Sequence, residues 1–315
     1  MKKEIFDIIN KSNTIALFGH KSPDGDAIGS VLAFYDMLSN INKEVDMIMT
    51  DVPPLFSYLK HIDKIKETSQ KEYDLAIVLD CANRERIGQN NDVFSNCRTS
   101  VAIDHHITNT EFCDINYIEP DAPACCQVIY YLFKEMNMNI TNDMGYAIAT
   151  GLLTDTGGYR NNNVNNKTFL MSADLIELGI DIHQIYYDVL CKKTVAQQEL
   201  IKMACDRLEY FCDGKIAFSY ISAEDMENIG AKFGDHEGLV DIGRNVEGVV
   251  VSVFLREDNG YKVSFRSNGE INVNEIAAIF GGGGHLMAAG AKINLSFKET
   301  KDAVIKEITK AINYE

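Results

Sequence analysis

The sequence predicts an α/β protein of two domains, a doubly wound and mainly parallel sheet followed by a smaller α+β domain. The first observation is a set of short apolar runs such as YDLAIVLD (73–80), which are typical of parallel strands buried on both faces. The second is that segments with helical spacing alternate with these runs. The third is a change of pattern after Asp213-Gly214, and 315 residues are enough for two such domains.

In the first domain, residues 1–187, a strand is expected at each apolar run: 14–18, 44–49, 73–80 and 100–103. Helices are expected at 3–11, from Ala27 to Leu38 and through most of 121–155, with helical sequence continuing to about residue 210. In the helix after the first strand, Ile28, Val31 and Leu32 share one face, so this helix should pack on the sheet. Residues 188–212 are interpreted as a helical linker.

The second domain, residues 213–315, has the signals of a small α+β fold. A strand is expected at 215–221, and two strands at 249–255 and 261–266 should form a hairpin around Asp258-Asn259-Gly260. Helices are expected at 223–230, 274–280 and 298–313, with another strand before the last of them.

Potential metal ligands follow the first strand in the stretch HKSPDGDAIGS (20–30), which contains His20, Asp24 and Asp26. In open α/β sheets, ligands bind beyond the carboxyl ends of the strands. Asp24 and Asp26 are two residues apart, about 6–7 Å, which suits carboxylates that address two ions roughly 3.5–4 Å apart. A role as helix N-cap would explain Asp26 alone and would not explain His20 and Asp24.

Other strand and helix ends carry the same residue types: Asp80, Asp104, His105, His106 and Asp155. Carboxylates mixed with imidazoles favour harder divalent ions such as Mn²⁺. The eight cysteines include no C-x-x-C pair, so neither structural zinc nor a disulfide framework is predicted. Two cations at such a site would lower the pKa of a bridging water and clamp phosphoryl oxygens.

A formal net charge of −16 argues against binding of long nucleic acid, which needs many contacts from Lys and Arg to phosphates. A small phosphorylated ligand remains compatible if bound cations supply positive charge. No signal peptide and no apolar stretch of about 18 residues is found, so we expect a cytoplasmic protein with reduced thiols and no membrane partner.

Four N-terminal motifs resemble those of the DHH phosphoesterase superfamily: HKSPDGDAIGS, VLDCAN (78–83), AIDHHITN (102–109) and GLLTDTGGYR (151–160). The stretch SFRSNGEINVNEIAAIFGGGGHLMAAGA (264–291) resembles the DHHA1 domain of that superfamily. The chain most resembles the bacterial nanoRNase/pAp phosphatase group. The resemblance implies hydrolysis of short 5′-phosphorylated oligoribonucleotides such as pApA to mononucleotides, and of pAp to AMP, with no long duplex as substrate. A homodimer is compatible with this resemblance.

The resemblance also implies residue roles. His20 and Asp24 would hold one Mn²⁺ and Asp26, His105 and Asp155 a second, with Asp80 bridging both. Asp104 would fix an imidazole tautomer, and His106 would face the substrate phosphate, so the implied catalytic residues are Asp80, Asp104 and His106. The implied substrate contacts are Asn83, Arg266, Ser267, Gly282, Gly283, Gly284 and His285.

The glycine run before His285 also suits a backbone cradle for phosphate, because missing side chains let N–H groups approach an anion. One of its glycines would serve as the cap of the preceding helix. In TGGYR the chain departs from its relatives, which leaves the role of Tyr159 and Arg160 open. Two alternatives stand beside the main hypothesis, a cyclic-di-AMP or linear dinucleotide phosphodiesterase and a non-catalytic nucleotide sensor.

Overall fold

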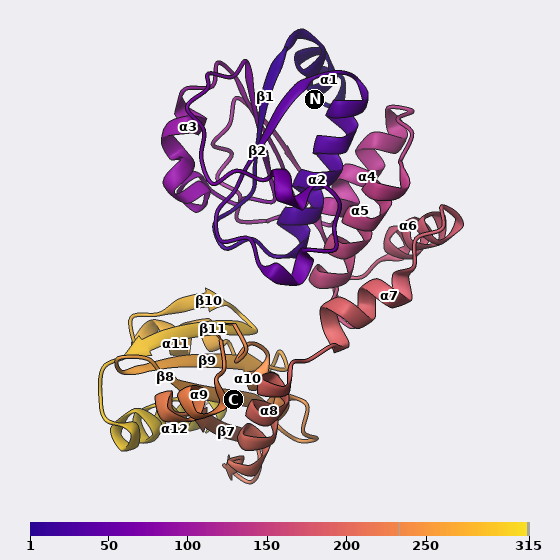
Figure 1. The fold of residues 1–315 in the computed structure, drawn as a ribbon. Coiled ribbons are helices and arrows are strands. Elements are labelled where there is room, and N and C mark those ends of the chain that lie inside the picture. Colours follow the sequence, from indigo (N-terminus) through magenta and orange to yellow (C-terminus); the bar gives the residue numbers. More distant parts are fainter. Residues whose placement is uncertain (233, 314–315) are drawn as a thin grey trace. The chain divides into compact units, whose positions relative to one another are not determined.

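The computed structural model describes residues 1–232 and 234–313. The chain divides into two compact units, Met1–Lys192 and Lys193–Glu315 (Figure 1). Each unit has its own sheet and its own buried core.

The first unit is built on a five-stranded sheet in the order β2-β1-β3-β4-β5, in which every neighbouring pair is parallel. The strands are β1 (Thr14–Phe18), β2 (Glu44–Ile48), β3 (Leu75–Leu79), β4 (Ser100–Asp104) and β5 (Ile115–Ile118). Strand β3 is central and buried at all of its positions, which is why its sequence is a continuous apolar run. This sheet confirms the predicted fold class.

Helices cover both faces of this sheet. On one face the strands pack against α1 (Lys2–Lys11), α2 (Gly25–Asn40), α4 (Cys125–Glu135) and α5 (Asn142–Asp155). On the other face they pack against a 3₁₀ segment (Arg84–Asn90) and α3 (Asn91–Ser95). The unit also contains α6 (Asn166–Glu177), α7 (Ile182–Tyr186), short 3₁₀ turns (Pro54–Phe56, Ile62–Lys64) and a π-helical turn (Tyr187–Cys191).

The second unit has a six-stranded sheet in the order β10-β11-β9-β8-β7-β6, in which the β7–β8 pair is parallel and the other pairs are antiparallel. Its strands are β6 (Glu209–Phe211), β7 (Ile216–Ile221), β8 (Val251–Glu257), β9 (Tyr261–Ser267), β10 (Gly283–His285) and β11 (Ala288–Ile293). Helices α11 (Val273–Ile279) and α12 (Phe297–Asn313) pack on one face. On the other face lie α8 (Val195–Asp206), α9 (Ala223–Ile229) and α10 (Leu239–Arg244).

Residues 188–212, expected to form a helical linker, do not form a separate segment between the two units. Most of these residues form helix α8 and strand β6, and both belong to the second unit. Leu200 and Ala204 of α8 are fully buried against a cluster that includes Phe254 of β8, so tertiary packing makes this segment part of the second core. No helix in the described ranges, 1–232 and 234–313, is long and apolar enough to cross a membrane.

Candidate active site

The candidate site lies where the strand order of the first sheet reverses. Strand β1 is followed in space by β2 on one side and by β3 on the other, so the loops after β1 and β3 diverge at this point. Such a switch point is where open α/β sheets bind ligands. His20, Asp24 and Asp26 follow β1, and Asp80 follows β3.

His20, Asp24 and Asp80 form the first group of potential metal ligands, with one donor atom of each lying within 4.8 Å of the others. His20 Nε2 lies 3.8 Å from Asp24 Oδ1 and 3.7 Å from Asp80 Oδ2. The Nδ1 atom of the same ring lies 2.9 Å from the carbonyl oxygen of Lys21. A carbonyl only accepts, so Nδ1 carries the proton and the lone pair of Nε2 faces the carboxylates.

Asp26, His105 and Asp155 form a second group, in which one donor atom of each residue again lies within 4.8 Å of the others. His105 Nε2 lies 3.8 Å from Asp26 Oδ2 and 3.4 Å from Asp155 Oδ2. Its Nδ1 lies 3.1 Å from the carbonyl oxygen of Ala122, which again directs the Nε2 lone pair toward the carboxylates. Asp155 is the last residue of α5, so a helix end brings this carboxylate into the group.

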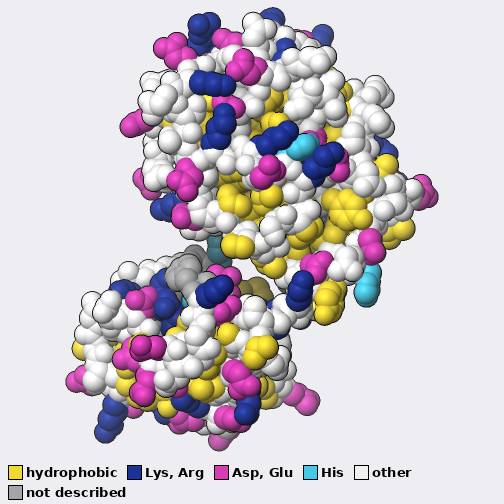
Figure 2. Space-filling model, viewed as in Figure 1, with side chains coloured by type: hydrophobic (Ala, Val, Ile, Leu, Met, Phe, Trp, Pro, Cys, Tyr) yellow, Lys and Arg dark blue, Asp and Glu magenta, His cyan; other side chains and the backbone are white. Residues whose placement is uncertain are grey.

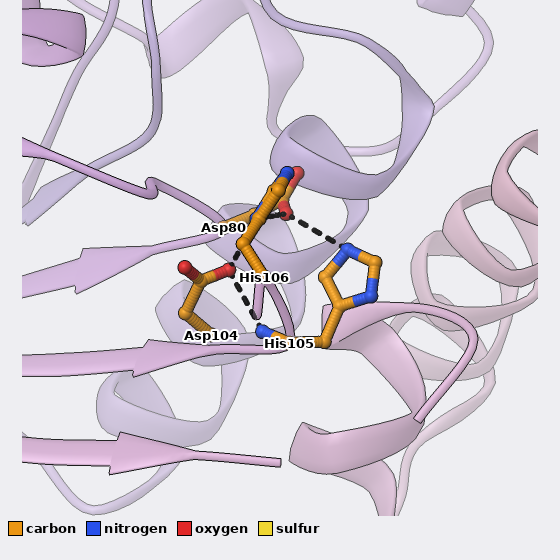
Figure 3. A group of neighbouring side chains, drawn as sticks. All are labelled: Asp80, Asp104, His105 and His106. Carbon is orange, nitrogen blue, oxygen red and sulfur yellow. Dashed lines mark hydrogen bonds and ion pairs between the residues drawn. The ribbon is translucent and has the colours of Figure 1, made fainter. Parts of the chain in front are cut away.

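Asp80 lies between the two groups. Its Oδ2 faces His20, while its Oδ1 is 3.5 Å from His105 Nε2, and Figure 3 shows the Asp80 carboxylate and the His105 ring pointing toward one another. Both Asp80 Oδ1 and His105 Nε2 are buried without a hydrogen-bond partner. Asp80 also has a φ of 54°, a left-handed conformation that costs a non-glycine residue free energy and is concentrated at functional sites. Asp80 is therefore placed where its two oxygens face both groups of potential ligands.

The carboxylates of the two groups lie close together in a buried site, so positive charge beside them would stabilise their ionised forms. Burial and the neighbouring Asp80 carboxylate raise the pKa of Asp26 to about 7. Burial opposes the charged form of His105, yet the close Asp80 carboxylate and the charges of Asp26 and Asp155 raise the pKa of His105 to about 10. Two divalent cations would match the four carboxylates of the two groups, which are Asp24, Asp26, Asp80 and Asp155. The residues present therefore fit a pair of oxygen- and imidazole-bound cations.

Asp104 and His106 make a hydrogen-bonded pair behind the ligands. The Nδ1–H group of His106 donates to Asp104 Oδ1 at 2.7 Å, which leaves Nε2 as the ring atom available to a ligand. Asp104 is fully buried and also accepts from the backbone N–H of His105. Burial would raise the pKa of Asp104, but the hydrogen bond and charge of His106 hold that pKa below its usual value.

In the second unit, Arg266 and His285 project from the same face of the sheet. In the strand register, Ala288 of β11 pairs with Arg266 of β9 on one side and with His285 of β10 on the other. Directly paired residues point to the same face, so the two side chains flank Ala288 with their Cα atoms roughly 10 Å apart. The small side chain between them leaves room for an anion.

Residues 14–154 match the DHH family, N-terminal domain, and residues 213–313 match the DHHA1 domain. A bifunctional oligoribonuclease and PAP phosphatase, NrnA, from Thermus thermophilus is 31% identical over 93% of this chain and 89% of its own. This chain belongs to the DHH family. The two units are therefore named the DHH unit and the DHHA1 unit below.

Other proteins are similar over most of the chain. NrnA of Bacillus subtilis is 27% identical over 93% of each chain. The crystal structure of an exopolyphosphatase-related protein from Bacteroides fragilis has a TM-score of 0.90 and 28% identity, and the match covers 97% of this chain and 95% of that one. A manganese complex of RecJ from Thermus thermophilus, with a TM-score of 0.56 and 13% identity, shares the fold.

Within the DHH unit, Asp26 is held by the N-terminus of helix α4. Its two carboxylate oxygens accept the backbone N–H groups of Cys125 and Cys126 at 2.5 and 2.9 Å. The N-cap of α2 is Asp24, whose Oδ1 accepts from the N–H groups of Asp26 and Ala27, so the N-cap interpretation of Asp26 is wrong. The Cys125 and Cys126 contacts were missed because the sequence separation is about one hundred residues.

Asn109 is a positioning residue that our assignment of roles omitted. Its side-chain amide donates to Asp104 Oδ2 at 2.7 Å and to the carbonyl oxygen of Cys81. It thereby holds the carboxylate that orients His106. The position of Asn109 at the end of the motif AIDHHITN could have indicated this role. Asparagine is also a common turn residue, so its presence in a loop does not by itself indicate a role in the site.

Two residues expected to contact substrate have other partners in the structure. Ser267 is fully buried, and its hydroxyl accepts from the N–H groups of Gly269 and Ile271. It lies next to Arg266 on β9, so its side chain points to the opposite face, and a side-chain contact with substrate is not available to it. Asn83 caps the following 3₁₀ segment by accepting from the N–H of Arg86.

Tyr159 and Arg160, whose roles were open, lie against their own loop and helix α6. The Tyr159 hydroxyl is 3.0 Å from Ser172 Oγ, its ring stacks on Phe169, and Arg160 Nε donates to the carbonyl of Gly157. Tyr159 therefore packs within the DHH unit, whereas Arg160 is exposed and bonds to its own loop.

The glycine run of the DHHA1 unit, 281–284, caps helix α11 and then enters strand β10. Gly281 has the expected cap geometry, with a φ of 73° and its N–H donating to the carbonyl of Ala278. A side chain at Gly282 or Gly284 would collide with the backbone of β11, so these two glycines are required for the close approach of the strands. Gly283 differs, because a Cβ there would meet nothing nearer than Asn274 Oδ1 at 3.7 Å, and Gly283 is exposed.

We expect Gly284→Ala to lower the stability of the DHHA1 unit by about 1–3 kcal/mol, the usual cost of overpacking. The new Cβ would lie 2.5 Å from the carbonyl oxygen of Ala288, and the φ of 153° is unfavourable for alanine. Denaturant unfolding would measure this, with Gly283→Ala as the control that should unfold like the wild type. Equal destabilisation by both changes would contradict the assignment of separate roles.

Proposed function

We propose that this chain is a Mn²⁺-dependent phosphoesterase that hydrolyses short 5′-phosphorylated oligoribonucleotides to mononucleotides and pAp to AMP. The observation that carries the proposal is the Asp80 carboxylate, which faces both ligand groups at the switch point of the DHH sheet. The NrnA proteins of Thermus thermophilus and Bacillus subtilis, named as oligoribonuclease and PAP phosphatase, support the substrate class.

The charge distribution favours a short substrate. The chain carries a formal net charge of −16, and basic and acidic side chains are interspersed on the face drawn in Figure 2. Long nucleic acid would need a continuous basic surface. A substrate of one or two nucleotides needs only local cationic groups, which the site can provide.

The chemistry divides between the two units. When bound, a pair of divalent cations would polarise the phosphoryl group and supply a nucleophile from water at neutral pH. His20, Asp24, Asp26, Asp80, His105 and Asp155 would hold them. His106, oriented by Asp104, would place Nε2 at the scissile phosphate to neutralise charge or transfer a proton.

The DHHA1 unit would anchor the substrate. Arg266, His285 and the exposed backbone of Gly283 would hold the 5′-phosphate, so that the phosphorus on O3′ of the same nucleoside is the one attacked. pAp and a 5′-phosphorylated dinucleotide share these two groups. Breaking the P–O3′ bond then releases a 5′-mononucleotide with phosphate or a shortened chain, which predicts 5′-to-3′ polarity.

We expect removal of the 5′-phosphate to reduce both turnover and affinity, because an anchored phosphate orients the scissile group. The test is a trinucleotide labelled at its 3′ end, with and without a 5′-phosphate, on the wild type, Arg266→Ala and Gly283→Ala. Arg266→Ala should abolish the preference for the phosphorylated substrate. Early release of the labelled 3′ nucleotide, or indifference to the 5′-phosphate, would overturn the anchoring role.

A second candidate function within the same class is a cyclic-di-AMP or linear dinucleotide phosphodiesterase. Its support is the cyclic-di-AMP phosphodiesterase PdeA of Listeria monocytogenes, 24% identical over 97% of this chain but over only 48% of its own length. Comparing turnover of pAp, pApA, longer linear oligomers and cyclic-di-AMP would rank the two. A complete lack of turnover with Mn²⁺, together with retained nucleotide binding, would instead indicate a sensor.

A further inference from the structure

The DHHA1 sheet carries a row of cations beyond Arg266. In the strand register, Lys262 of β9 pairs directly with Arg256 of β8 on one side and with Lys292 of β11 on the other. Like charges in directly opposed positions destabilise a sheet unless something neutralises them. Asp258 pairs with Arg256 Nη2 at 2.8 Å, but Arg256 Nε is buried without a hydrogen-bond partner.

A cleft of about 440 Å³ connects this row to Arg266. Lys262, Ser264 and Arg266 alternate along β9, so all three line the same face, and about 13 Å separates the Cα atoms at the two ends. The far wall includes His236, Gly238 and Val240, and Glu237 supplies one carboxylate among the described lining residues. Helix α10 packs against β7, β8 and β9, and its residue Val240 lines the cleft together with Lys262, Ser264 and Arg266 of β9.

Cationic side chains outnumber carboxylates in the described lining of the cleft, where Arg256, Lys262 and Arg266 face the single carboxylate of Glu237. Burial lowers the pKa of His236, and the charges of Arg256 and Lys262 lower it further, to about 4. Burial lowers the pKa of Arg266; the charge of Asp241 opposes this shift and the charge of Arg244 adds to it. The cleft therefore holds cations close together in a protein whose overall charge is strongly negative.

We propose that this cleft binds the outer phosphates of a 5′-polyphosphate, so that short oligonucleotides bearing a 5′-triphosphate are substrates as well as those bearing a monophosphate. The proposal rests on the proposed function, in which Arg266 holds the first 5′-phosphate. Arg266 and Lys262 lie at the two ends of the β9 part of the cleft, so further phosphates attached to the one held by Arg266 can extend along β9 toward Lys262 and Arg256. Lys262 and Arg256 then contact the second and third phosphates.

Such substrates have a defined chemical origin. A polymerase that begins synthesis on a nucleoside triphosphate leaves three phosphates on the first nucleotide, and early release gives a short 5′-triphosphorylated chain. Hydrolysis of its first P–O3′ bond would release a nucleoside triphosphate and a chain with a new 5′-phosphate. One water adds across the broken bond, so no further reactant is needed.

The test compares pApA with pppApA on the full chain with Mn²⁺. The wild type should cleave both, and Lys262→Gln should lower kcat/KM for pppApA by about tenfold or more, the effect of losing a hydrogen bond to a charged group. The same variant should leave pApA within about twofold. The matched control is Lys298→Gln, which removes an equal charge from exposed α12 on the opposite face and should change neither substrate.

A binding measurement separates this proposal from the proposed function. Inorganic tripolyphosphate is titrated calorimetrically into the full chain in chelator, where the cations of the DHH unit play no part. The wild type should bind it more tightly than inorganic phosphate, and Lys262→Gln should lose that difference. Equal binding of both anions, or an equal loss of pApA and pppApA turnover in Lys262→Gln, would overturn the cleft assignment even if pAp is hydrolysed normally.

Discussion

Asp80→Asn should abolish the hydrolysis of pAp and lower Mn²⁺ affinity by more than the 10–100-fold that loss of an outer-sphere partner costs. The carboxylate faces both ligand groups, so its charge is lost to two cations at once. Asparagine keeps the shape of the side chain and tolerates the left-handed φ of 54°, so the backbone turn after β3 should be preserved. Metal content and phosphate release of the purified variant measure both effects.

The same variant provides its own control for folding. In chelator, Asp80→Asn should be at least as stable as the wild type, because one buried charge next to Asp26 is removed. Mn²⁺ should raise the Tm of the wild type through binding to the native state, and this rise should be much smaller in the variant. Two bound ions with near-normal turnover would show that Asp80 is not the shared ligand.

His105→Ala and His106→Ala should fail in different ways although the residues are adjacent. His105 Nε2 faces Asp26, Asp80 and Asp155, so its loss should lower metal occupancy. His106 is bonded through Nδ1 to Asp104, so its loss should spare the metals and reduce kcat by about 10²–10⁴-fold, the range of acid–base groups. Metal analysis and steady-state kinetics on each variant distinguish the two roles.

The matched control for this pair is His183→Ala, which removes an exposed imidazole from α7 and should leave both metal content and kcat unchanged. Lower metal occupancy in His106→Ala with normal occupancy in His105→Ala would mean that the roles are exchanged. Asn109→Ala should resemble a weaker His106→Ala, because Asn109 acts through Asp104.

Local sequence determined the order of the elements and the identity of the groups at their ends. The strand β3 is recognisable because a strand covered on both faces must be apolar throughout, and Asp80 follows it directly. The same reasoning placed polar residues after β1 and β4. These features are local, since strand length, apolar spacing and the residue that ends a strand depend on neighbours along the chain.

Other features depended on packing between distant segments. Strand β5 and the strand β10 within the glycine run form because a partner edge is present, and their own sequences are only weakly strand-like. Most of the segment expected to be a linker belongs to the second unit, because Leu200 and Ala204 of α8 are buried in a hydrophobic cluster of that unit. The buried position of the Ser267 side chain could not be predicted, because it depends on strand alternation and on the register of β9.

The sequence alone thus determined which residue types stand at each strand and helix end of the candidate site. Only the tertiary structure decided that Asp80 lies between His20 and His105, and that the N-terminus of α4 holds Asp26. Both arrangements bring together residues far apart in the chain. Their relative positions are set by the parallel register of β1, β3 and β4 and by the packing of α2 against α4 and α5, because burial of the shared core fixes where each loop begins.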